Sequence, residues 1–93
     1  MSATKLEFDD SHLASQLFGP QNQHLKLLGE RLGVRIDSRG NSVTINVDDG
    51  DDPKAELATQ VLSQLYAMIK KGKSVYPQDV DFACRVLERQ PSA

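Results

Sequence analysis

The sequence has few of the features that mark a secreted or membrane-bound protein. Its 93 residues include one cysteine, Cys84, which excludes an internal disulfide and fits a reducing compartment. No apolar run reaches the roughly 18–20 residues that a membrane span needs, and the beginning MSATKLEF lacks the apolar core of a signal peptide. We therefore expect a cytoplasmic domain with no membrane partner.

An excess of positive charge is also missing. The chain has 11 Lys and Arg against 13 Asp and Glu, a formal net charge of -2, so no global field attracts nucleic acid. Any site for a polyanion has to be local, built from a few side chains and backbone amides.

Patterns for catalysis and metal binding are absent as well. The phosphate-cradling loop GxxxxGK[ST] does not occur, and no nucleophile-base arrangement can be argued from the spacing. His12 and His24 share no ligand spacing with Cys84, and the acidic run at residues 48–52 lacks the closing Glu of a calcium loop. We expect no catalytic residue, metal or cofactor in this segment, and a stand-alone enzyme is the least favoured function.

What the chain does contain is clear hydrophobic periodicity. Leu25, Leu28 and Leu32 form a helical stripe that Gly33 ends, and alternation on either side of the turn cluster at residues 38–41 predicts a hairpin. The expected strands are 5–8, 34–37 and 43–47. The expected helices end at Phe18, at Gly33, near Lys70–Gly72 and near residue 90, the last with Pro77 in its first turn and Cys84 on its inner face.

This order, β-α-α-β-β-α plus one extra α, predicts an α+β fold in which helices cover a three-stranded sheet. We expect one domain over residues 1–93. Its β-α-α-β-β-α core would span 4–72, and the extra C-terminal helix 75–90.

The break between the first two helices carries the functional argument. Gly19, Pro20, Gln21 and Asn22 join them, and the second helix would present free backbone N–H groups and its positive dipole end to an anion. Gly19 lets a ligand backbone come close because it has no side chain. The alternative is a helix-helix turn that merely fixes packing.

The stretch LFGPQN, the leucine stripe and the closing GVRI resemble a KH domain of type I, whose GxxG loop clamps a nucleic-acid backbone. Asn22 stands where that loop has its second Gly. Asn tolerates the left-handed conformation, although its side chain would crowd a phosphate and the loop carries no Lys or Arg.

Cations outside the loop extend the candidate site. His24 and Lys26 lie within about one helical turn of it, and Arg35 and Arg39 belong to the expected hairpin, where either could reach a phosphate or a base edge. The alternative for all four is ordinary solvated surface. The favoured interpretation of the lysines at 70, 71 and 73 is that they cap the end of a helix. The alternative is that they bind a polyanion or dock a second domain.

A wider resemblance covers nearly the whole chain. The runs FDDSHLASQLFGPQNQHLKLLGERLGVRIDSRGNSVTI and VLSQLYAMIKKGKSVYPQDVDFACRVL resemble the N-terminal segment of PhoH-family proteins. The resemblance implies a KH-like segment that precedes a P-loop ATPase domain using ATP and Mg²⁺, in a cytoplasmic bacterial protein tied to phosphate starvation or RNA metabolism.

Two functions follow as hypotheses. In the first, the domain binds single-stranded RNA or DNA, with RNA favoured, and offers it to the ATPase domain. In the second, it is a protein-interaction or homo-oligomerisation element that packs on its own ATPase domain or on a sister subunit, which the net charge of -2 and the uncharged loop favour.

Overall fold

The computed structural model describes residues 2–48 and 52–89 and confirms the α+β class and the expected order of elements. The strands are β1 (Ser2–Glu7), β2 (Arg35–Arg39) and β3 (Ser42–Val47), and the helices are α1 (Ser11–Phe18), α2 (Gln23–Leu32), α3 (Asp52–Lys70) and α4 (Pro77–Arg89). A 3₁₀ turn over Pro20–Asn22 joins α1 to α2. The three-stranded sheet with helices packed on it is compatible with a KH-like fold.

The sheet is organised by β3, its central strand. The order is β1-β3-β2 and both pairings are antiparallel. Val43, Ile45 and Val47 alternate along β3 and are buried, because successive side chains of a strand point to opposite faces. Leu6 of β1 opposes Val43, and Ile36 of β2 opposes Ile45, so the apolar side chains of all three strands gather on one face.

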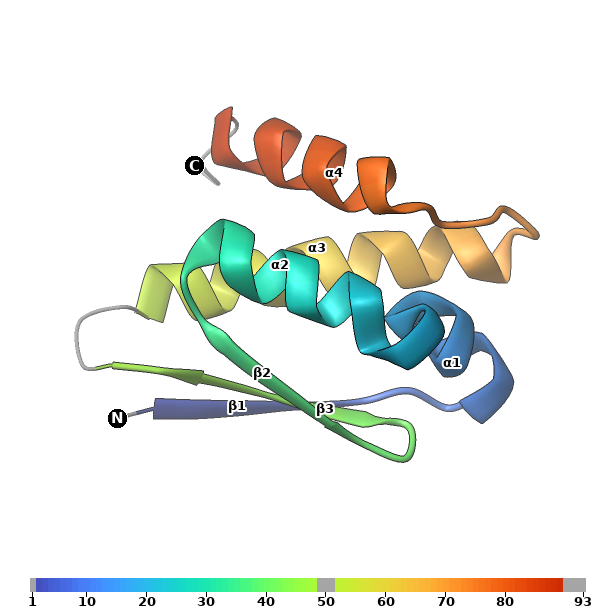
Figure 1. Cartoon of the computed structure of the whole chain (residues 1–93), viewed down its shortest axis with the longest axis horizontal. Helices are drawn as coiled ribbons and strands as arrows, with labels where there is room; N and C mark the ends of the chain where they lie inside the picture. Colours follow the sequence, from blue (N-terminus) through green and yellow to red (C-terminus); the bar gives the residue numbers. More distant parts are fainter. Residues whose placement is uncertain (1, 49–51, 90–93) are drawn as a thin grey trace.

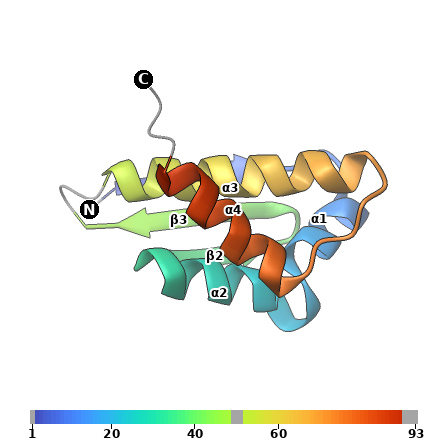
Figure 2. The same cartoon turned by 90° about the horizontal axis from the view of Figure 1, so that it is seen from above.

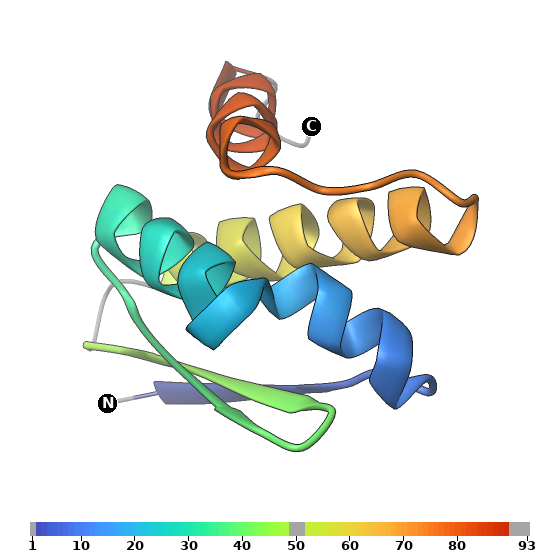
Figure 3. The ribbon, with the colours of Figure 1, turned by 45° about the vertical axis from the view of Figure 1, so that its right-hand side comes forward.

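Helices cover that apolar face in two layers. Figure 1 shows α1, α2 and α3 lying on one side of the sheet, with α4 outermost. Seen from above, α4 crosses over α2 and α3 (Figure 2), and the oblique view separates the sheet, the middle helices and α4 (Figure 3). The long connection from α3 to α4 passes the corner where α1 meets α2, and this brings distant parts of the sequence together at the loop.

Aromatic side chains fix the corner from β1 into α1. The Phe8 ring lies 6.1 Å from Phe18, edge to face, and 4.7 Å from Tyr66 of α3, in the range where aromatic pairs attract. Asp10 caps α1, its carboxylate accepting from the backbone N–H of His12 and of Leu13 at 2.9 and 3.1 Å.

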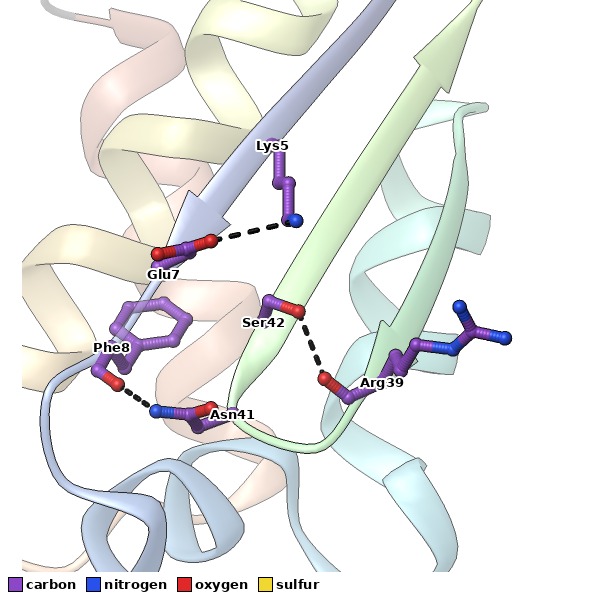
Figure 4. A network of polar contacts seen from close by, with 6 residues as sticks. All are labelled: Lys5, Glu7, Phe8, Arg39, Asn41 and Ser42. Carbon is purple, nitrogen blue, oxygen red and sulfur yellow. Dashed lines mark hydrogen bonds and ion pairs between the residues drawn. The ribbon is translucent and has the colours of Figure 1, made fainter.

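The hairpin tip is tied to the end of β1 through Asn41. The Phe8 N–H donates to the Asn41 carbonyl at 3.0 Å, and the Asn41 side-chain amide donates to the Phe8 carbonyl, as Figure 4 shows. These bonds extend the β1–β3 pairing past Glu7 and hold the register of the sheet.

Helix α4 docks through apolar packing and an ion-pair group. Val80, Ala83 and Cys84 are buried on its inner face. Arg31 of α2 contacts Asp81 at 3.2 Å and Glu88 at 3.4 Å. These side chains are more than a third exposed, so the pairs orient α4 more than they stabilise it.

Several expected boundaries are wrong by a few residues. β1 begins at Ser2 and ends at Glu7, before Phe8, because Phe8 turns into the aromatic cluster. Ser38 and Arg39 belong to β2, so the hairpin turn is limited to Gly40 and Asn41. α3 begins at Asp52, so Pro53 lies in its first turn, where its missing N–H costs nothing. Of the acidic run, Asp49 and Asp51 lie outside the described residues.

Candidate nucleic-acid interface

The α1–α2 loop has an unusual backbone over three of its four residues. Gly19 ends α1 at φ 79° and ψ 173°, and Gln21 and Asn22 follow at φ 55° and 60°. The Gly19 combination is open essentially to glycine alone, so the conformation explains why glycine stands there. Asn22 adopts the left-handed conformation that the sequence predicts it can tolerate.

His24 lies beneath this loop. It was expected on the helix surface, but its side chain is 5% exposed, and its Nδ1 lies 2.9 Å from the carbonyl oxygen of Leu17. A carbonyl only accepts, so Nδ1 carries a proton and donates this bond. A Cβ placed on Gly19 would lie 2.8 Å from Nδ1. The imidazole therefore occupies the space that any larger residue at position 19 would need.

Several loop amides expected to be free are engaged. Gly19 N–H donates to Ser15 O and Asn22 N–H to Gly19 O, both at 3.1 Å, and Gln23 N–H donates to Pro20 O. Binding of an anion at the start of a helix requires free backbone N–H groups. These three N–H groups are not free. A ligand at this corner therefore cannot use these three amides.

A groove of about 500 Å³ runs between α2 and β2. Lys26 and Arg35 line it together, with Leu25, Ile36 and Val47 as apolar lining. Glu30 and Asp48 also line the groove and lower its positive potential. The structure thus brings two of the expected cations, Lys26 and Arg35, to one apolar surface. The sequence pattern alone could not show that they lie together.

The two arginines of β2 differ in their surroundings. The Arg35 side chain is 81% exposed and its Nε lies 3.6 Å from Asp37 on the same strand, a contact that exposure to water makes weak. Arg39 lies beside the hairpin turn, where its carbonyl accepts from the Ser42 hydroxyl at 2.9 Å and its side chain extends away from that bond (Figure 4). It lines none of the three hollows described in this section and below.

Two further hollows follow the loop. One, of about 610 Å³, is lined by Gly19, Pro20 and His24 together with the segment that enters α4. The other, of about 370 Å³, is lined by Pro20, Gln21 and Lys26. Tyr76 also lines the larger hollow and was not among the predicted site residues. The available signal was an aromatic residue directly before a helix-starting proline.

A metal or membrane role finds no support in the described ranges. Residues 2–48 and 52–89 contain no group of three or more His, Cys, Asp and Glu side chains placed to hold a metal ion. The motif GxxxxGK[ST] is also missing from the sequence, and the expectation about ATP and Mg²⁺ stays a prediction. Within the same ranges, none of the helices has the length and apolar character needed to cross a bilayer.

Comparison with known proteins gives one informative match. No family model and no solved structure matches the chain. The chain is 33% identical over 85 residues to a PhoH-like protein of Bacillus subtilis strain 168. The resemblance to the PhoH family is confirmed. The match covers 91% of this chain but 25% of the relative, which is consistent with a small N-terminal domain of a PhoH-family protein.

The thiol of this PhoH-like domain gives a pH-dependent prediction. Burial raises the pKa of Cys84 from 9.0 to about 11; nearby Arg31 lowers it, while Glu88 and Asp81 add to the rise. Because the folded pKa is raised, the stabilisation from the protonated thiol is complete below pH 9.0 and is lost as the pH rises toward about 11. We expect the free energy of unfolding to fall more steeply over this range in the wild type than in Cys84→Ala, measured by urea unfolding. Parallel pH profiles would contradict the assignment.

Proposed function

We propose that this domain binds single-stranded nucleic acid, RNA in preference to DNA, as the KH-like module of a cytoplasmic PhoH-family ATP-binding protein. The observation that carries the proposal is the groove between α2 and β2, where Lys26 and Arg35 flank an apolar surface. Bases can lie on apolar side chains while phosphates meet cations. A ligand with alternating flat apolar and anionic parts fits this lining better than a purely charged one.

The affinity should be modest and should depend only weakly on salt. Two cations contact the groove, and two carboxylates, Glu30 and Asp48, oppose them. Few phosphate contacts release few counterions, so we expect dissociation constants of roughly 10⁻⁴–10⁻⁶ M at physiological salt. Such weak binding suits a module that delivers a strand to a neighbouring domain and does not retain it.

The PhoH relationship supplies the rest of the proposal. The chain spans about a quarter of the curated relative, and we propose that a P-loop ATPase domain, with ATP and Mg²⁺ as its ligands, belongs to the same polypeptide. That domain and the nucleic acid would be the partners of this one. RNA metabolism and phosphate starvation are the processes that the family resemblance suggests.

The groove offers a direct test through Lys26→Glu. This change reverses the charge of one of the two cations that line the groove. We expect Lys26→Glu to bind labelled single-stranded RNA about 3–10 times more weakly than the wild type, in fluorescence anisotropy at low salt. The matched control is Lys5→Glu, the same charge reversal at an exposed residue outside the groove, which should bind as the wild type does. Absence of binding by the wild type, to RNA and to DNA, would contradict the proposal.

A second candidate function is association with protein, and one observation favours it. Phe82 is 67% exposed on α4, while its neighbours Ala83 and Cys84 are buried. A partner that covered the Phe82 ring would gain the free energy of removing its apolar surface from water. The favoured partner is the ATPase domain of the same protein, and a sister subunit in a homo-oligomer is the other outcome.

Light scattering and ATPase assays on the full-length protein separate these outcomes. We expect Phe82→Lys to change the ATPase rate if the domain packs on its own ATPase domain, or the mass in solution if it packs on a sister subunit. Gln78→Lys, an equal change of charge at an exposed site of the same helix, should alter neither. If Phe82→Lys also leaves both measurements unchanged, the association function loses its support.

A further inference from the structure

The larger hollow beside the loop is separate from the α2–β2 groove and shares no lining residue with it. Its volume is about 610 Å³. It is lined by His12, Ser15 and Gln16 of α1, Gln23 and His24 of α2, and Ser74 to Pro77 of the α3–α4 connection. Figure 2 shows this connection running past α1 to the start of α4. The hollow exists because the extra helix returns the chain to the α1–α2 corner.

The lining is polar but carries no permanent charge. Among the described residues that form it there is no Lys, Arg, Asp or Glu, so nothing in it favours a phosphate. The side-chain amides of Gln16 and Gln23 each offer donors and an acceptor, and the imidazole of His24 lines the hollow beside them. Mixed donors and acceptors match the edge of a nucleobase, which presents both.

Tyr76 gives the hollow a flat aromatic surface. Its side chain is 58% exposed, yet its backbone is held firmly. The Tyr76 N–H donates to Asp79 Oδ2 at 2.8 Å, and its carbonyl accepts from the Asp79 N–H, also at 2.8 Å. Pro77 follows and fixes the next φ. A ring held this way loses little backbone freedom when a base stacks on it.

The hollow is continuous with the proposed strand path. The smaller hollow of about 370 Å³ shares Pro20 and Gln23 with it, and shares Lys26 and Glu30 with the α2–β2 groove. Helix α2 has 10 residues, a length of about 15 Å. A strand of a few nucleotides that follows α2 therefore reaches from Arg35, past the loop, to Tyr76.

We propose that this hollow is a base-binding subsite in which a nucleobase at one end of the bound strand stacks on Tyr76 and meets the side chains of Gln16, Gln23 and His24. The inference rests on the proposed binding of single-stranded nucleic acid. It assigns different parts of the strand to the two sites: the groove with Lys26 and Arg35 holds the sugar-phosphate backbone, and the uncharged hollow holds one base.

An abasic scan combined with Tyr76 variants tests the subsite. The probes are labelled RNA octamers in which a single abasic position is moved along the strand, measured by anisotropy at low salt. In the wild type, we expect one position near an end to weaken binding about five-fold or more, in line with the loss of one base-aromatic stack. Tyr76→Ala should weaken binding of the intact octamer by a similar factor and should abolish the cost of that abasic position. Tyr76→Phe keeps the ring and should stay within about two-fold of the wild type.

Controls separate this subsite from the wider function. Gln78→Ala, exposed on α4 and outside the hollow, should bind as the wild type does, and thermal melts should show that Tyr76→Ala remains folded. If Tyr76→Ala unfolds, the abasic scan of the wild type and Gln16→Ala still decide the matter. Binding that Lys26→Glu weakens, but that neither Tyr76→Ala nor any abasic position affects, would overturn the subsite and leave the proposed function standing. Absence of wild-type binding to every octamer would overturn both.

Discussion

The contact between His24 and Gly19 determines the shape of the whole α1–α2 corner. The imidazole is bonded to the last turn of α1 through Leu17 O and fills the space next to Gly19. It belongs to α2, so a single side chain joins the two helices and the turn between them. A buried polar ring that is hydrogen-bonded stabilises such a corner, whereas leaving the Leu17 carbonyl unpaired would cost about 1–3 kcal/mol. The loop is therefore held from within, before any ligand binds.

That constraint decides how the corner can act on a ligand. Its backbone donors at Gly19, Asn22 and Gln23 serve the fold, so the proposed recognition of a strand uses the side chains on either side. To one side lies the α2–β2 groove, which carries cations. To the other lies the uncharged hollow that the extra helix completes. The corner lies between the groove proposed for phosphates and the hollow proposed for a base.

Sequence patterns predicted the fold well because its determinants are local. The leucine stripe with Gly33, the alternation around Ile45 and Pro77 at a helix start each report on a few neighbouring residues, and the structure confirms those elements. The site depends on packing between distant segments. Nothing near His24 in the sequence signals that its ring turns inward to Leu17, and nothing near Tyr76 signals that the α3–α4 connection returns to the loop. The family resemblance supplied the candidate loop, but not the engagement of its amides.

A double-mutant cycle on the stability of the domain tests the central contact most directly. Gly19→Ala, His24→Ala and the double variant are compared with the wild type by urea unfolding. Because the added methyl group collides with the imidazole, the loss of stability from Gly19→Ala should be smaller when His24 is already Ala, with a coupling of about 0.5–3 kcal/mol. The backbone strain at φ 79° persists in both backgrounds and cancels. An equal loss in the two backgrounds would mean that His24 does not hold this corner.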